Sequence, residues 1–451
     1  MKIQWYRSAT VGIFSKSGTA ILCDPWITDG AFIGSWFHWP PLEGFEFDEL
    51  ANRKWDALYI SHFHADHFDR KLVAKIARNQ PSTIVLIPLY ENKWLKRAVE
   101  NCGFNSDRIL EIPSDQKIHF KDIDIKMYVA DYCNPEICGA SIPCTFSSNK
   151  LRANDSVALF EADGKRVLNA NDALAVHTAH KLWGRIGEID LLLGHFGGAG
   201  PYPQCFNTLS HESKKQEALK TGWMFANRLI STGTALKARF VFPYAGQYLL
   251  GGKLSALNDF RSVIPLPEVI SSIKDNSSSA PISLNAFGEF DLDSESSTGD
   301  WIEPSNVDKI DYITKISKIL YPYELGKPEF INGQKILVEA FNSIKPVFQR
   351  YLADGSTGSQ SSIVFQAGEI KAAVNFGKNF CSVTDTEIFS NVTTISADPR
   401  LLKRLLLRKP NYQGFTQYHF NQAEIGSHFE WSRIGQYPKE TQFLNYMQST
   451  I

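Results

Sequence analysis

A cluster of three histidines and one aspartate, directly after a short apolar run, constrains this chain more than any other feature. His62, His64, Asp66 and His67 fall within six residues, and the run Trp55–Ile60 before them predicts a buried strand that ends at the first histidine. The whole chain holds only 11 histidines, which argues against a chance run of exposed polar residues. Imidazole and carboxylate together suit zinc, iron or manganese better than calcium or magnesium. The cluster therefore predicts a metal site, with His62 and His64 on one ion and Asp66 and His67 turned toward a second.

The composition is ordinary for a soluble globular protein and argues against several classes of function. The 451 residues are 43% hydrophobic and 21% charged, with a formal net charge of −1 and no basic block, so nothing favours a nucleic-acid partner. No apolar run approaches the roughly 20 residues that span a bilayer, so no transmembrane segment is expected. Seven cysteines without CxxC pairs, and a start that lacks a signal-peptide core, fit a reducing compartment. We therefore expect a cytoplasmic protein that acts on a small molecule.

Short strands and helices alternate along the first part of the chain, which predicts an α/β layered core. Strands are expected at 2–6, 11–14, 20–23, 83–88, 156–161, 165–169, 190–193 and 240–242, with two more within 118–129. Helices are expected at 70–79, 93–101 and 214–229. Two serine-rich stretches, 275–280 and 294–299, are expected to be exposed connections.

A different pattern begins beyond about residue 305. A helix at 336–352, strands at 362–366 and 369–376 and a helix at 396–408 predict a small α+β module. We therefore expect a metal-binding catalytic domain over residues 1–300 and a C-terminal α+β module over 301–451. The exact boundary is left open. The module is expected either to cover the site or to pair two subunits as a homodimer.

Four ligands from one loop cannot close a two-ion site, so further side chains must arrive from elsewhere. Asp172 follows a predicted strand into a loop and is expected to bridge the ions, the alternative being the N-cap of a helix at 173–182. Asp155, just before the strand at 156, is a second candidate ligand, the alternative being a turn residue beside Asn154. His195 ends a strand and opens a glycine-rich loop, so it is expected either in the active site or as a structural residue.

The motif His62-x-His64-x-Asp66-His67 after a strand, with Asp172 far downstream, resembles the metallo-β-lactamase superfamily. The resemblance narrows to the lactamase-like part of CMP-N-acetylneuraminate hydroxylase and its bacterial relatives, and is strongest over roughly residues 1–250. It is carried by the segments 23–26, 30–32, 60–64, 167–172, 195–199, 202–203 and 243–246, and more weakly by 420–421. The resemblance implies an αββα sandwich, here with an additional C-terminal α+β module.

The chain departs from its expected relatives in three ways. The hydroxylase carries an N-terminal Rieske iron–sulfur domain, whereas this sequence starts at the lactamase-like strands, so the resemblance implies electrons from a separate Rieske protein or ferredoxin. The hydrolases of the superfamily place a histidine ahead of the strand at 156, where only Asp155 can substitute. Their late histidine would fall near Tyr244 and Ala245, where none occurs. Both hydrolase metal sites thus lose one imidazole.

Two classes of activity follow from this ligand set. A site rich in carboxylates, with open positions on one or two iron ions, favours an oxygenase that hydroxylates a sugar-like or other small polar metabolite. His195 and Tyr244 would then support the ligands or handle protons. The alternative is zinc, which lowers the pKa of bound water toward 7 and would make the protein a hydrolase of a phosphodiester, an ester or a lactone. In that case Asp66 would orient the water and His195 would protonate the leaving group. A non-catalytic binding protein that keeps a partial site is the third alternative.

Overall fold

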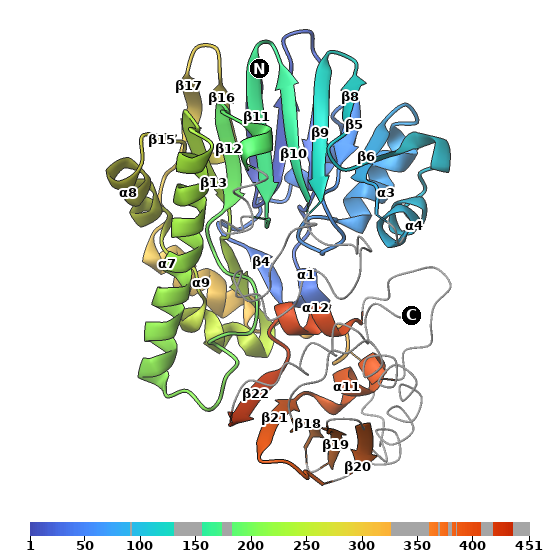
Figure 1. The fold of residues 1–451 in the computed structure, drawn as a ribbon, viewed down its shortest axis with the longest axis vertical. Helices are drawn as coiled ribbons and strands as arrows, with labels where there is room; N and C mark the ends of the chain where they lie inside the picture. The colour runs from blue at the N-terminus through green and yellow to red at the C-terminus, as the bar shows by residue number, and fades with distance from the viewer. Residues whose placement is uncertain are drawn as a thin grey trace.

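Two β-sheets pack face to face and form the main body of the chain (Figure 1). The computed structural model describes residues 1–90, 93–129, 156–173, 183–325, 360–368, 370–377, 381–384, 386–406 and 418–435. Helices cover the outer face of each sheet, which makes four layers in the order helix, sheet, sheet, helix. This arrangement confirms the αββα sandwich expected from the sequence.

The first sheet has eight strands in the order β17-β16-β1-β2-β3-β5-β6-β7. Their bounds are Lys2–Arg7 (β1), Thr10–Phe14 (β2), Ala20–Cys23 (β3), Ala57–Tyr59 (β5), Ile84–Pro88 (β6), Ile109–Ile112 (β7), Leu284–Asp291 (β16) and Ser296–Asp300 (β17). The second sheet has seven strands in the order β15-β13-β12-β11-β10-β9-β8. Their bounds are Lys117–Phe120 (β8), Ile123–Val129 (β9), Ser156–Ala162 (β10), Lys165–Asn171 (β11), Leu191–His195 (β12), Phe240–Ala245 (β13) and Ala280–Pro281 (β15).

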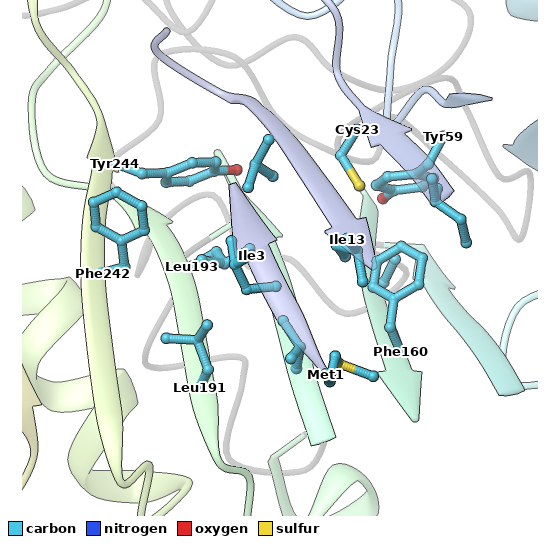
Figure 2. Packing of buried hydrophobic residues seen from close by; sticks show 14 of the residues in the cluster. Met1, Ile3, Ile13, Cys23, Tyr59, Phe160, Leu191, Leu193, Phe242 and Tyr244 are labelled. Atoms are coloured by element: carbon cyan, nitrogen blue, oxygen red, sulfur yellow. The ribbon is translucent and has the colours of Figure 1, made fainter. Parts of the chain in front are cut away.

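The main core lies between the inner faces of these sheets. Ile3 and Ile13 from the first sheet point toward Leu193 and Phe242 from the second (Figure 2). All of these side chains are almost wholly buried, and the removal of such apolar surface from water is the main force that holds two sheets together. Cys23 and Tyr59 lie beside each other at one end of this core, and Tyr244 lies at the same end on the second sheet (Figure 2).

The outer helices bury one apolar face each. The first sheet is covered by α2 (Glu46–Asn52), α3 (Arg70–Asn79) and α4 (Trp94–Glu100), and the second by α7 (His211–Ala235) and α8 (Leu266–Asn276). In α3, Leu72, Val73 and Ile76 recur at helical spacing and are fully buried against the sheet. Asp69 caps this helix by accepting hydrogen bonds from the backbone N–H groups of Lys71 and Leu72.

Parallel strands bring the metal-site segments to one edge of the sandwich. β3, β5 and β6 run parallel in the first sheet, and β11, β12 and β13 run parallel in the second. Because the carboxyl ends of parallel strands meet at the same edge of a sheet, the loops after β3 and β5 adjoin, as do those after β11 and β12. The histidine loop follows β5, Asp172 follows β11, and His195 ends β12.

Smaller elements surround this edge. They are α1 (Ala31–Gly34), the two-stranded pair of β4 (Trp36–His38) and β14 (Tyr248–Leu250), α9 (Asn306–Ile316) and the 3₁₀ helix Gly252–Phe260. A second 3₁₀ helix, Ser106–Arg108, precedes β7 at the opposite edge, where Arg108 donates to the carbonyl of Thr83. Trp36 stacks on Tyr248 with ring centroids 3.6 Å apart. Along the part of the chain that the structure describes, no helix has both the length and the apolar character needed to cross a bilayer.

The C-terminal module contains a five-stranded sheet in the order β20-β19-β18-β21-β22, which confirms its expected α+β character. Its elements are β18 (Ser361–Ala367), β19 (Ile370–Phe376), β20 (Cys381–Thr384), β21 (Asn391–Ser396), α11 (Pro399–Leu406), α12 (Phe420–Ile425) and β22 (Glu430–Ile434). The core of the module includes Cys205 and Phe206 from the main body, so the two parts share one apolar cluster. Helix α12 lies between the module's sheet and the edge that carries the metal-site loops (Figure 1).

The structure corrects one of the predicted connections. The stretch 294–299 was expected to be an exposed loop, but Ser296–Asp300 forms the edge strand β17, which pairs with β16. All five of its residues are exposed, so no apolar alternation marks it as a strand. The helix expected at 336–352 lies outside the described residues.

Candidate metal centre

Two imidazoles and one carboxylate converge where the two sheets meet. His62, His67 and Asp172 each offer one ligand atom, and these atoms lie within 4.8 Å of one another. Asp172 Oδ2 is 3.3 Å from His67 Nε2 and 3.9 Å from His62 Nε2. Both histidines are almost wholly buried, whereas the side chain of Asp172 is 28% exposed. This carboxylate from the second sheet therefore lies between two imidazoles from the first.

The other two members of the histidine loop lie beside this triad. His64 Nδ1 is 2.9 Å from His62 Nε2, and Asp66 Oδ2 is 3.6 Å from His67 Nε2. The loop thus brings four side chains together. Their expected division between two ions stays a prediction, although the triad groups His62 with His67 rather than with His64.

Asp24 is a buried member of the centre whose role the sequence did not reveal. It follows β3 with a positive φ of 43° and is fully buried. Its Oδ1 accepts the backbone N–H of Ser61 at 2.7 Å, and its Oδ2 lies 2.9 Å from Ser61 Oγ and 3.2 Å from His67 Nδ1. The parallel pairing of β3 with β5 places it beside the histidine loop. The sequence signal that could have identified Asp24 is that an acidic residue directly follows a buried strand.

Asp24 determines which ring nitrogen of His67 faces the centre. Because Asp24 accepts the hydrogen of Nδ1, Nε2 is the nitrogen that faces Asp172 and would bind a metal ion there. His62 is oriented in the same sense, since its Nδ1 lies 2.9 Å from Ser61 Oγ, which itself donates to Asp24. One buried carboxylate therefore orients both imidazoles, directly for His67 and through Ser61 for His62.

The backbone of the loop is braced at its first residue. The carbonyl oxygen of Ser61 accepts hydrogen bonds from Tyr90 Oη at 3.0 Å and from Ser156 Oγ at 3.1 Å. At the far end, the backbone N–H groups of His67 and Phe68 both donate to the carbonyl of His64. These bonds hold the loop in a tight turn and so fix the relative placement of its side chains.

The electrostatics of the centre fit a divalent cation. Burial and the neighbouring charge of His67 lower the pKa of His62 to about 3, so its imidazole is neutral. Burial acts in the same direction on His67, but the charges of Asp172 and Asp66 outweigh it and raise its pKa well above the usual value. In turn, the charge of His67 outweighs burial and lowers the pKa of Asp172. The carboxyl groups of Asp24, Asp66 and Asp172 surround His67, so a metal ion bound among them would displace the proton of His67.

Asp172 owes its position to the asparagine before it. Asn171 is buried with a positive φ of 49°, a conformation that asparagine tolerates better than most residues. Its Nδ2 donates to the carbonyl of Ser156 at 3.0 Å and contacts Tyr59 Oη at 3.3 Å, and its Oδ1 accepts the hydroxyl of Tyr244 at 3.0 Å. These bonds fix the end of β11 and therefore the start of the loop that carries Asp172.

His195 and Tyr244, which were both expected to be catalytic, differ in how they contact the ligand cluster. His195 Nδ1 lies 2.8 Å from the carbonyl oxygen of Asn171 and 3.7 Å from Asp172 Oδ1, so this histidine adjoins the ligand cluster. The hydroxyl of Tyr244 donates to Asn169 Oδ1 at 2.6 Å as well as to Asn171. Tyr244 therefore reaches the centre through Asn171. Their catalytic roles stay predictions.

Asp155 lies outside the described residues, so its expected role as a ligand stays a prediction. The same is true of most of the helix that Asp172 was alternatively expected to cap. The absence of a late histidine is visible in the register of the second sheet, where Ala245 pairs with His195.

The C-terminal module reaches this centre through Asn421 of α12. Its Oδ1 lies 2.8 Å from His64 Nε2, across 357 residues of sequence. Asn421 is almost wholly buried. The segment 420–421 had been noted only as a weak part of the family resemblance, and no local pattern indicated that it would meet the histidine loop.

Glu424, one turn along α12, predicts a pH dependence. Burial raises the pKa of its carboxyl to about 7, whereas the unfolded chain releases the proton near pH 4.5. The stability that the neutral form provides is therefore complete below pH 4.5 and is lost as the pH rises through 7. We expect Glu424→Gln to match the wild-type protein at pH 4.5 and to be more stable at pH 8 by up to about 2 kcal/mol. Urea denaturation of both proteins at the two pH values measures this, and an equal difference at both would contradict it.

Comparison with known proteins supports the resemblance noted in the sequence. No protein-family model matches the chain. It is similar to a putative Rieske 2Fe-2S iron–sulfur protein of Mycolicibacterium smegmatis, with 28% identity over 253 residues that make up 55% of this chain and 44% of that protein. It is also similar to the cytidine monophosphate-N-acetylneuraminic acid hydroxylase of Danio rerio, with 24% identity over 240 residues, or 51% of this chain and 35% of that protein. The chain thus spans less than half the length of these curated relatives.

Among solved structures, similar ones include CmlA, a diiron β-hydroxylase from Streptomyces venezuelae. It is 16% identical, and the match covers 62% of this chain and 52% of that chain with a TM-score of 0.39. Another is the metallo-β-lactamase-fold protein YhfI from Bacillus subtilis, which is 10% identical, with 64% of this chain and 99% of that chain covered and a TM-score of 0.36.

Proposed function

We propose that this metallo-β-lactamase-fold protein is an iron-dependent oxygenase that hydroxylates a sugar-like or other small polar metabolite. The observation that carries the proposal is the convergence of His62, His67 and Asp172. Two imidazoles and one carboxylate, with the remaining positions open, are the ligand set of non-haem iron oxygenases. The similarity to the hydroxylase of Danio rerio over half of this chain supports the same reaction class.

The chain's own residues divide into ligands and supporting groups. His62, His67 and Asp172 would hold one ion, with His64 Nδ1 turned toward the same ion, and Asp66 and Asp155 would complete a second position. Bound iron would supply the activation of dioxygen. Asp24 keeps the Nδ1 hydrogen of His67 turned away from the ion. His195, whose Nδ1 hydrogen is committed to the carbonyl of Asn171, retains Nε2 to accept or return a proton.

Zinc-dependent hydrolysis is the second candidate function. The observation that favours it is the intact histidine loop, in which Asp66 lies 3.6 Å from His67 and can orient an attacking water. The substrates expected in that case are a phosphodiester, an ester or a lactone. Among the described residues, Ala245 rather than a histidine stands opposite His195 in the sheet, and this favours iron.

An oxygenase of this kind needs electrons from a second protein or domain. The names of the mycobacterial relatives describe Rieske iron–sulfur proteins. We propose that a separate Rieske protein or ferredoxin serves as the donor. The substrate and the donor would then approach the same edge of the sandwich, where the ligands lie.

Metal content and oxygen uptake distinguish the two functions. The protein is purified from cells supplied equally with iron and zinc, its bound metal is measured, and oxygen consumption is followed with a chemical reductant. We expect about one or two iron ions per chain and reductant-dependent oxygen uptake. Zinc alone, with turnover of a model phosphodiester or lactone, would overturn the oxygenase in favour of the hydrolase. Failure to load either metal would overturn both.

A further inference from the structure

We propose that the C-terminal module is a structural part of the metal centre, and that Asn421 is the positioning residue through which it acts. Asn421 holds His64 so that Nδ1 of its ring faces the ion. The inference rests on the proposed metal site but goes beyond it, because it assigns a role to a module outside the sandwich that carries the histidine loop.

The geometry around His64 carries the proposal. One ring nitrogen, Nδ1, lies 2.9 Å from His62 Nε2, the atom that His62 offers to the ion. The other, Nε2, lies 2.8 Å from Asn421 Oδ1. A neutral imidazole has one N–H group and one lone pair. If Nε2–H of His64 donates to the amide oxygen of Asn421, the lone pair of the His64 ring is on Nδ1. That atom faces the same side as Nε2 of His62, the atom that His62 offers to the ion.

Each histidine of the loop then has its own partner on the side away from the ion. Asp24 orients His67, and Ser61 orients His62. Both partners come from the first sheet or the loop itself, whereas the partner of His64 comes from α12. Partners of this kind fix the tautomer and the ring plane of metal-binding histidines, and their loss typically costs 10–100-fold in metal affinity.

The main body holds α12 in place at several points. His428 Nε2 lies 2.9 Å from the carbonyl oxygen of Phe32, in the turn α1, and the ring of Phe32 in turn contacts the ring of His64. Trp431 exchanges backbone hydrogen bonds with the segment 205–207, and its ring stacks on Phe206 with centroids 5.9 Å apart. Asn421 therefore lies on a helix whose following segment is bound to the main body at His428 and Trp431, and this attachment supports a fixed position for the imidazole of His64.

Cobalt binding tests the proposal without any need for turnover. The metal-free full-length protein is titrated with Co²⁺, and both the affinity and the visible absorption bands are recorded. We expect Asn421→Ala to bind Co²⁺ about 10–100-fold more weakly, with altered bands. Asn421→Asp keeps an oxygen acceptor for Nε2–H and is expected to bind within a few-fold of the wild-type protein. If Asn421→Asp loses as much affinity as Asn421→Ala, or if Asn421→Ala loses none, the proposal is wrong.

Two further variants distinguish a specific effect of Asn421 on His64 from a general weakening of the contact between the module and the main body. Asn207→Ala removes the 2.7 Å hydrogen bond to Glu430, which also joins the main body to the module but does not touch a histidine. We expect it to leave Co²⁺ affinity unchanged, and an equal loss would show that general docking is responsible. In a His64→Ala background, Asn421→Ala is expected to have no further effect on affinity, because its partner is already gone.

The same measurements test the positioning role of Asn421 separately from the proposed oxygenase activity. If the wild-type protein binds Co²⁺ and Asn421→Ala weakens it, but iron gives no oxygen uptake, the oxygenase is wrong and the role of Asn421 stands. If iron and oxygen uptake are as expected but Asn421→Ala binds metal normally, only the positioning role is wrong. If the wild-type protein binds no metal ion, both are overturned.

Discussion

Replacing His67 with alanine is expected to abolish tight metal binding and, with it, the activity of the protein. His67 is the residue around which the centre is built, because its ring lies within 3.6 Å of carboxylate oxygens from Asp24, Asp66 and Asp172. Loss of a partner behind a ligand already costs about 10–100-fold in affinity, so loss of the ligand itself should cost more than about 100-fold. The measurements are iron content after dialysis, Co²⁺ affinity and reductant-dependent oxygen uptake.

A matched control is available in His119. It is also paired with an aspartate, at 2.8 Å from Asp124, but its side chain is 72% exposed and lies on β8, the outermost strand of the second sheet. We expect His119→Ala to load metal like the wild-type protein. If His67→Ala retained a full equivalent of tightly bound metal with unchanged affinity, the centre would have to be built on other ligands. Far-UV circular dichroism of both variants would show whether the fold is intact.

The parts of the centre that could be predicted are those whose signal is local. The histidine loop is contiguous and follows an apolar strand, so its position at the end of β5 followed from periodicity. Asp172 could be placed in the same way, because it follows a strand that leaves a hairpin. In both cases the sequence neighbours of the residue determine the environment of its side chain.

Asp24 and Asn421 could not be assigned because their contacts are distant in sequence. Asp24 meets His67 across 43 residues, only because β3 and β5 pair as parallel neighbours. Asn421 meets His64 across 357 residues, which depends on how the C-terminal module docks. Periodicity predicts that strands and helices exist, but it does not predict strand order or module docking.

The strands of the fold likewise divide into those with a local sequence signal and those without one. The strands β2, β3 and β6 are apolar and buried, and were predicted to within one residue of their observed bounds. The outer edge of the first sheet was not predicted, because β17 is wholly exposed and β16 joins β1 from far along the chain, with Gln4 meeting Phe287 across 283 residues. A strand whose side chains all face water gives no periodic signal, and periodicity does not show which distant strand will pair with another.

Replacing Asp24 with asparagine is expected to weaken metal binding about 10–100-fold while the fold is kept. Asparagine has the same shape, and its one carbonyl oxygen can still accept the backbone N–H of Ser61, as Oδ1 of Asp24 does at 2.7 Å. Its amide group would then face Ser61 Oγ and His67 Nδ1, which are both donors to Oδ2 in the wild-type protein. A metal-bound His67 must carry its hydrogen on Nδ1, because Nε2, the nitrogen that faces Asp172, holds the ion. In the variant this hydrogen would oppose the amide hydrogens of the asparagine, and the repulsion would weaken metal binding.

The stability and affinity effects of Asp24→Asn should separate. Burial already raises the pKa of Asp24, so a neutral side chain relieves part of the cost of a buried charge. The misplaced amide hydrogens cost about 1–3 kcal/mol in the opposite direction, so the free energy of unfolding of the metal-free protein should change little. Asp69→Asn is the matched control, because Asp69 is also buried beside the histidine loop and its Oδ1 caps α3, a cap that asparagine retains. The variant loses the 3.3 Å hydrogen bond from the backbone N–H of Ile27 to Oδ2, which does not involve a histidine. If Asp24→Asn bound Co²⁺ as tightly as Asp69→Asn, the orientation of His67 would have to come from Asp66 and Asp172 alone.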